Sequence, residues 1–261
     1  MEMTGQVVLV TGAQQGIGRA IALACAGAGA DVAVNYLDDA VAAEAVCEAI
    51  RALGRRAVAL QADIAAPARS AGLVAEAEEA LGPLDVLVNN AGIAGPTGAV
   101  EEIHPEDWDR CIEVCLTSQF NCARLAVPHL RKSGNASIVN LSSAAGKFGF
   151  GFRSPYAAAK WGVIGFTRSL AIELGEAGIR VNAILPGLVA GDRQRRVLEA
   201  KAQQRGIGFA EMERIAFSYT SIKDYVTPRQ LADQILFLCS RRGATISGQA
   251  ISVDGDTRML T

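Results

Sequence analysis

The chain has 261 residues, of which 50% are hydrophobic and 20% are charged, and its formal net charge is -2. This length and composition suit one large globular domain, so we expect residues 1–261 to form a single domain. The small net charge gives no broad basic field, which argues against nucleic acid or an anionic membrane as a partner. The acidic start of the chain and the lack of an apolar run of about 18 residues predict neither export nor a membrane span, so we expect a cytoplasmic protein.

Short runs rich in Val, Ile and Leu alternate along the chain with longer stretches of helical periodicity. Each short run is bounded by Gly, Asp, Asn or Pro, which is typical of a strand buried on both faces. The expected strands are 6–11, 31–36, 56–62, 84–90, 136–142, 179–185 and 249–255. Because parallel neighbours need crossover helices, the alternation predicts an α/β fold with a doubly wound, seven-stranded parallel sheet of the Rossmann-like type. Residues 188–227 exceed an ordinary loop, and we expect them to form a lid.

Six cysteines occur without a CxxC pair, so we expect neither a disulfide framework nor a zinc ribbon. Cys111, Cys115, Cys122 and His129 recur at helical spacing, which raises the possibility of a metal site. These residues would extend over about 27 Å of helix, too far for a single ion to bridge. We therefore expect no metal, and we interpret the cysteines as reduced thiols on a buried helix face.

The stretch TGAQQGIG at 11–18 follows the first expected strand and opens a helix. Glycines at 12, 16 and 18 would let the backbone turn sharply and approach a pyrophosphate, while the helix N-terminus offers free N–H groups. The spacing G-x-x-x-G-x-G differs from the common G-x-G-x-x-G fingerprint of dinucleotide sites. A purely structural turn, or a site for another nucleotide-like ligand, stays open as an alternative.

The stretch SPYAAAKWG at 154–162 places Tyr156 and Lys160 four residues apart, on one face of an expected helix. Transfer of a proton to or from a substrate hydroxyl needs an acid or base at that oxygen. A free phenol ionises near pH 10 and is a poor base at neutral pH, but a nearby ammonium favours the phenolate. An ordinary half-exposed helix pair is the alternative for these two residues taken alone.

Five stretches together resemble the short-chain dehydrogenase/reductase (SDR) family over nearly the whole chain. They are TGAQQGIG at 11–18, NNAG at 89–92, NLSSAAG at 140–146, YAAAK at 156–160 and RVNAILPG at 180–187. The resemblance implies an NAD(P)-dependent oxidoreductase that interconverts an alcohol and a carbonyl compound, assembled as a homotetramer or homodimer. It also implies that Ser143, Tyr156 and Lys160 are catalytic, whereas strand alternation should direct the neighbouring Ser142 elsewhere.

The same resemblance implies where the cofactor binds. Asp63 resembles the acid that accepts a hydrogen bond from the adenine amine, and NNAG lines the cofactor site. The full set expected to bind the cofactor is Gly12, Gln15, Gly16, Ile17, Gly18, Tyr36, Asp63, Ile64, Asn90, Ala91, Gly92, Tyr156, Lys160, Pro186, Gly187 and Val189.

Three positions bear on cofactor choice and turnover. Tyr36 ends the second strand where an NAD enzyme usually has an acid, which favours NADP, although NAD stays possible because Asp38 is close and Gln15 takes the usual basic position. Cys115 stands where the family often has an asparagine that holds a proton-relay water. Gly191 stands where a threonine usually contacts the carboxamide.

The substrate is the least determined part of the interpretation. Side chains among Phe148, Phe150, Phe152 and Arg153 should wall the pocket. We expect a small-molecule substrate: a secondary alcohol, polyol, sugar or ketone, with a ketoacyl-type reductase as one possibility. A regulatory dinucleotide-binding protein with little turnover is the alternative. The lid concentrates basic residues that suggest an anionic substrate, although a solvated helix face is the simpler explanation: Arg193, Arg195, Arg196, Lys201 and Arg205.

Overall fold

The computed structural model describes residues 2–260, apart from the side chain of residue 69. Seven parallel strands form one sheet in the order β3-β2-β1-β4-β5-β6-β7, which confirms the doubly wound prediction. The strands are β1 (Val7–Val10), β2 (Asp31–Tyr36), β3 (Ala57–Gln61), β4 (Val86–Asn89), β5 (Ser137–Leu141), β6 (Arg180–Pro186) and β7 (Ala250–Val253).

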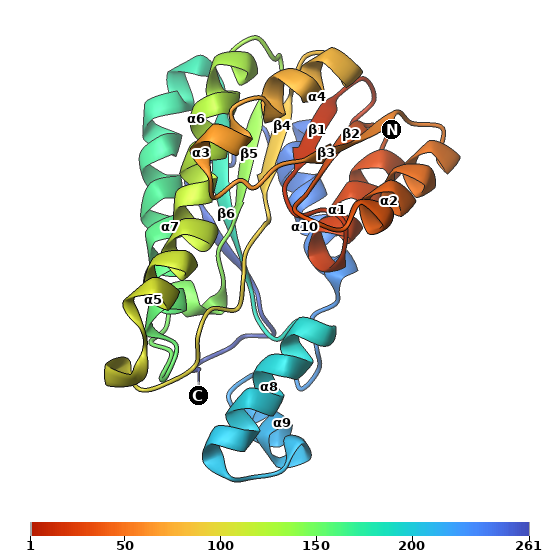
Figure 1. Cartoon of the computed structure of the whole chain (residues 1–261). Helices are drawn as coiled ribbons and strands as arrows, with labels where there is room; N and C mark the ends of the chain where they lie inside the picture. Colours follow the sequence, from red (N-terminus) through yellow and green to blue (C-terminus); the bar gives the residue numbers. More distant parts are fainter. Residues whose placement is uncertain (1, 261) are drawn as a thin grey trace.

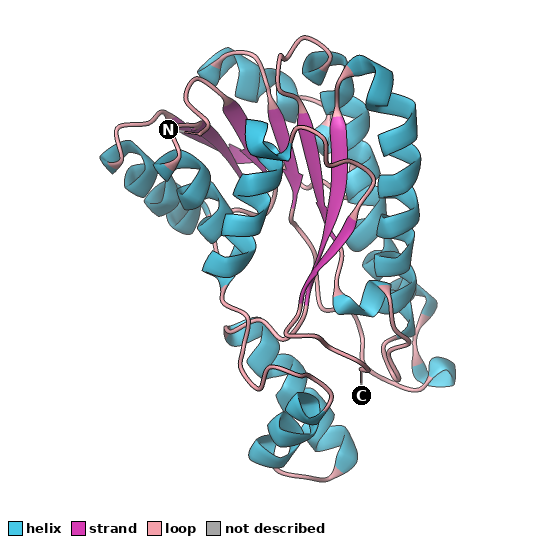
Figure 2. Cartoon of the chain, turned by 180° about the vertical axis from the view of Figure 1, so that it is seen from behind, coloured by secondary structure: helices cyan, strands magenta, loops and turns pink. Residues whose placement is uncertain are grey.

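Helices cover both faces of the sheet, as Figure 2 shows. The layer on one face consists of α1 (Gly16–Gly27), α2 (Ala40–Ala52) and α10 (Pro228–Cys239). The layer on the other consists of α4 (Leu73–Leu81), α6 (Ser118–Leu130) and α7 (Ser154–Leu174). Two shorter helices, α3 (Pro67–Ser70) and α5 (Pro105–Ile112), precede α4 and α6. No helix within residues 2–260 is long and apolar enough to cross a membrane.

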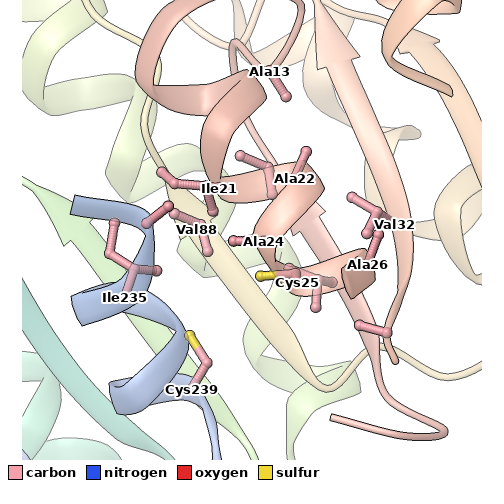
Figure 3. Close-up of a cluster of buried hydrophobic side chains, with 14 of the residues drawn as sticks. Ala13, Ile21, Ala22, Ala24, Cys25, Ala26, Val32, Val88, Ile235 and Cys239 are labelled. Carbon is pink, nitrogen blue, oxygen red and sulfur yellow. The ribbon is translucent and has the colours of Figure 1, made fainter. Parts of the chain in front are cut away.

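Each strand feeds two hydrophobic cores because successive side chains point to opposite faces. In β1, Val8 and Val10 belong to the core under α1, α2 and α10, whereas Val7 and Leu9 belong to the core under α4, α6 and α7. Figure 3 shows the first core, where small residues of α1 let the helix approach Ile235 and its neighbours on α10. The continuous apolar runs of the sequence therefore match strands buried on both sides.

The segment 188–227 leaves the sheet and returns to it. It contains α8 (Asp192–Arg205) and α9 (Phe209–Ser218), which extend beyond the sheet in Figure 1. These helices have a small core of their own around Leu198, Ala202 and Met212. The two stems of the segment pair with each other, since the Ala190 amide donates to the Val226 carbonyl at 2.9 Å. The segment is thus an ordered helical excursion anchored at its base.

Candidate functional site

The strand order reverses at β1, which pairs with β2 on one side and β4 on the other. Ligands of doubly wound folds bind outside the carboxyl ends of the strands at such a switch point. A cavity of about 790 Å³ lies here, lined by the glycine turn, the NNAG loop, the start of α7 and the first part of α8. It is large enough for an extended ligand, and every residue expected to bind the cofactor lines it except Tyr36.

The glycine turn forms a close-fitting cradle at the N-terminus of α1. Gly12 and Gly16 have φ of +60° and +56°, in the left-handed region that favours glycine. A Cβ on Gly18 would lie 2.4 Å from the Gly12 carbonyl oxygen and 2.5 Å from Nδ2 of Asn90, so no side chain fits there. No side chain caps α1, which leaves its first N–H groups for a ligand. These features fit the pyrophosphate of a dinucleotide.

Three polar side chains hold the cradle against the sheet. Nδ2 of Asn90 donates to the carbonyls of Thr11 and Gly12, at 2.8 and 3.1 Å, and Thr11 Oγ1 accepts from the Asn90 amide at 3.0 Å. Oδ1 of the buried Asn35 accepts from the Gly12 amide at 3.2 Å, while its Nδ2 donates to the carbonyls of Leu60, in β3, and Ala62, just beyond it. Sequence analysis missed Asn35, although a polar residue inside an apolar strand was the signal that could have identified it.

Around the end of β2, the structure differs from the sequence-based expectation. Tyr36 does not line the cavity, because strand alternation turns its side chain into the core beneath α1 and α2. Its neighbours Asn35 and Leu37 line the cavity instead, together with Arg19 of α1, which sequence analysis also missed. Asp63 lines the cavity as expected, and its carboxylate accepts from the Ala65 amide at 3.0 Å.

The start of α7 brings the expected catalytic residues to one wall of the cavity. Tyr156 and Lys160, one helical turn apart, both line it, and Lys160 Nζ lies 5.6 Å from the centre of the Tyr156 ring. The buried Lys160 donates from Nζ to the Leu141 carbonyl at 2.8 Å. Ser143 is partly exposed to the cavity, whereas Ser142 is buried and donates to the Lys160 carbonyl at 2.7 Å. Ser143 is therefore the more available of the two hydroxyls.

Cys115 lies directly behind this wall. A Cβ on Gly92 would be 3.8 Å from both the Cys115 sulfur and Lys160 Nζ, so the thiol occupies the space next to the lysine. It donates to the Ile93 carbonyl at 3.5 Å from within a turn of π-helix, Glu113–Thr117. Such turns are frequent at functional sites.

The three cysteines and the histidine that recur at helical spacing lie in different parts of the structure. Cys111 and Cys115 lie in a small cluster beside α7. Cys122 belongs to the core under α4, α6 and α7, and His129 pairs with Glu78 at 2.7 Å. Among the residues that the structure describes, no group of three or more His, Cys, Asp or Glu could hold a metal ion.

The backbone conformation at position 191 explains why the residue there is a glycine. It precedes α8 with a φ of +138°, a conformation that a threonine could adopt only with strain. The turn into α8 therefore requires glycine at the position where the family usually has threonine.

Aromatic and basic side chains line the cavity beside Tyr156. Of the residues expected to wall the pocket, Phe150 and Arg153 line it, whereas Phe148 and Phe152 do not. Arg153 is 2% exposed, and its guanidinium carbon lies 5.2 Å from the centres of both the Phe150 and Tyr156 rings. Its Nη2 donates to the carbonyl of Ala94.

The basic residues of α8 separate into two groups. Arg193 crosses to the NNAG loop, where its Nη2 donates to the Gly92 carbonyl at 2.6 Å, and Arg196 and Lys201 also line the cavity. Arg195 instead pairs with Glu199 at 2.9 Å on the exposed side of the helix, and Arg205 does not line the cavity. Of the basic residues on α8, only Arg193, Arg196 and Lys201 therefore line the cavity.

A family model described as enoyl-(acyl carrier protein) reductase, of the short-chain dehydrogenase type, matches residues 12–256. The chain belongs to the short-chain dehydrogenase/reductase family. It is 36% identical to a 3-oxoacyl-[acyl-carrier-protein] reductase of Staphylococcus aureus over 99% of this chain and 100% of that protein. It is also 36% identical to a D-beta-hydroxybutyrate dehydrogenase of Cupriavidus necator, over 97% of this chain and 98% of that protein.

A solved structure of a short-chain dehydrogenase from Burkholderia cenocepacia, in complex with NADP, has the same fold. It is 35% identical, covers 98% of each chain and superposes with a TM-score of 0.88. Membership of the SDR family confirms the prediction of an NAD(P)-dependent oxidoreductase acting on a small-molecule substrate.

Proposed function

We propose that the protein interconverts a small ketone and the matching secondary alcohol with NADP as the preferred cofactor, and that Ser143, Tyr156 and Lys160 are its catalytic residues. The observation that carries the proposal is the placement of Tyr156 and Lys160 on one wall of a cavity that also contains the glycine cradle. When bound, the nicotinamide ring supplies or accepts the hydride. The chain's own residues must then manage the proton on the substrate oxygen.

In this proposal Tyr156 gives a proton to the carbonyl oxygen during reduction and takes it back during oxidation. Lys160 places a positive charge beside the Tyr156 ring, where it stabilises the negative charge that develops on the phenol oxygen during proton transfer, and the Leu141 carbonyl keeps the ammonium in position. Ser143 donates a hydrogen bond to the same substrate oxygen, which orients it toward the phenol. Because a thiol is a weak hydrogen-bonding group, Cys115 makes a poor relay between Lys160 and solvent, and we expect slower proton return than with an asparagine.

The preference for NADP is supported by the charge around the end of β2. Leu37 lines the cavity there and brings no carboxylate that would repel a 2′-phosphate. Arg19 lines the same cavity and could pair with that phosphate. Comparison of kcat/KM for NADPH and NADH tests the preference, and a higher value for NADH would overturn it.

The catalytic assignment is tested by Tyr156→Phe, which removes only the hydroxyl. We expect kcat to fall at least 100-fold, within the range that general acid–base groups contribute. The affinity for NADPH, measured by its fluorescence, should change less than threefold, since the cradle is untouched. Tyr225→Phe is the matched control, because that phenol binds Glu213 and does not line the cavity. Retention of turnover in Tyr156→Phe would refute the assignment.

We also propose that residues 188–227 act as a lid. The helices of this segment have their own small core, and the segment meets the NNAG loop through the bond from Arg193 to Gly92. An anchored helical segment of this kind can close over a ligand and exclude water.

A homotetramer or homodimer is proposed on the basis of apolar side chains on the outer faces of α6 and α7. Phe120, Trp161 and Ile172 are 49%, 51% and 84% exposed, which favours their burial against another copy of the chain. Light scattering after size exclusion tests this, and a monomeric mass would contradict it. The cytoplasmic location remains a prediction.

A further inference from the structure

Arg193, in the first turn of α8, joins the proposed lid to the NNAG loop across the cavity. Its Nη2 donates to the Gly92 carbonyl at 2.6 Å, and both residues line the cavity. This bond uses only one of the N–H donors of the guanidinium. Among the residues that the structure describes, Arg193 has no carboxylate partner, whereas Arg195 on the same helix pairs with Glu199. Arg193 therefore brings a positive charge to the cavity that only a neutral acceptor holds.

Gly92 lies where the glycine cradle meets the wall that carries Lys160. On one side, a Cβ on Gly12 would be 3.1 Å from the Cα of Ala91, so the NNAG loop packs against the cradle immediately before Gly92. On the other side, a Cβ on Gly92 would lie 3.8 Å from Lys160 Nζ. A dinucleotide with its pyrophosphate in the cradle and its reacting ring beside Tyr156 must therefore pass the Gly92 carbonyl, where the guanidinium now lies.

The charge of Arg193 also reaches the group that the charge of Lys160 reaches. A hydrogen bond with Cys111 lowers the pKa of the Cys115 thiol, while burial opposes this shift. The positive charges of Lys160 and Arg193 lower that pKa as well. Because Cys115 lies directly behind the catalytic wall, both cations act on the same end of the cavity. An anion bound at this end would be attracted by both of them.

We propose that Arg193 is a cofactor-binding residue, which exchanges the Gly92 carbonyl for the pyrophosphate of NADP and so draws α8 onto the bound cofactor. This rests on the proposed function and adds a binding residue to its lid. The phosphate is the stronger acceptor, because charged hydrogen bonds are about twice as strong as neutral ones. A guanidinium also matches phosphate geometry with two parallel donors. The cradle would then hold the pyrophosphate from the sheet, and Arg193 would hold it from the lid.

The proposal is tested by the binding of three probes to Arg193→Met. NADPH and 2′-phospho-ADP-ribose both carry the pyrophosphate, and the second lacks the nicotinamide, whereas adenosine 2′-monophosphate carries no pyrophosphate. We expect the affinity for the first two, measured by fluorescence and calorimetry, to fall about 10- to 100-fold, the range of charged hydrogen bonds. The affinity for adenosine 2′-monophosphate should stay within about threefold of the wild-type value. Arg193→Lys keeps the charge but loses the paired donors, so it should bind NADPH with intermediate affinity.

Arg195→Met is the control on the same helix, because Arg195 pairs with Glu199 and does not line the cavity, and its affinities should match the wild type. Equal losses for all three probes in Arg193→Met, or unchanged affinity for 2′-phospho-ADP-ribose, would overturn the proposal. Tighter binding of NADPH to Arg193→Met would also overturn it, since the guanidinium would then obstruct the cofactor. If the probes bind as expected but no ketone is reduced, the binding residue stands and the proposed reaction fails.

Discussion

Gly18→Ala puts a methyl group into the tightest point of the cradle. The added Cβ would lie 2.4 Å from the Gly12 carbonyl oxygen, 2.5 Å from Asn90 Nδ2 and 2.9 Å from the Ala13 Cα. Two of these three atoms belong to the backbone, so rotation of a flexible side chain cannot relieve the overlap. Overpacking of this kind costs about 1–3 kcal/mol. Displacing the Asn90 amide from its carbonyl partners costs about 1 kcal/mol more.

We therefore expect Gly18→Ala to lower the free energy of unfolding by about 2–4 kcal/mol, measured by urea denaturation. NADPH affinity should fall at least tenfold, because the loop that moves also forms the cradle. Gly27→Ala is the matched control on the same helix. A Cβ there meets nothing within 4 Å, and the gain in helix propensity should stabilise the protein by up to about 1 kcal/mol. Wild-type stability and NADPH affinity in Gly18→Ala would refute the close-packed cradle.

Two further predictions concern Lys201 and Cys115. With the pKa of Lys201 lowered to about 7, the amine loses its charge above that pH in the folded protein, which urea denaturation at several pH values should detect. Between about pH 7 and about pH 10.4 the amine of Lys201 is protonated in the unfolded chain but not in the folded chain. The free energy of unfolding should therefore rise with pH over this range. Lys201→Met should flatten that rise. Cys115→Asn should raise kcat by up to about tenfold by offering Lys160 a stronger hydrogen-bonding neighbour, and steady-state kinetics showing no gain would count against a relay at this position.

The sheet could be predicted from the sequence because a strand buried on both faces is a short continuous run of apolar residues. The expected range 31–36 matches β2, and the other expected strands differ from the observed ones by one or two residues at each end. The glycine turn and the spacing of Tyr156 and Lys160 are equally local. They depend only on a turn and on the period of one helix, so their placement at the cavity followed from the sequence.

The rest of the site depends on contacts between distant segments. Nothing in the local sequence shows that Arg193 reaches Gly92 or that Lys201 meets the ring of Phe150, because each contact depends on where α8 lies. Tyr36 shows how prediction from the sequence can fail at the end of a single strand. The alternation of side chains decides that Asn35 and Leu37, not Tyr36, face the cavity, and a shift of one residue reverses that choice.

All six cysteines are reduced and buried, which makes the native protein a convenient background for site-specific labelling. Maleimide dyes react with accessible thiolates, so the unmodified chain should take up dye slowly. A cysteine introduced on the outer side of α8, as in Arg195→Cys, would then carry a single fluorophore. Its emission would report the movement of α8 relative to the sheet as cofactor and substrate are added.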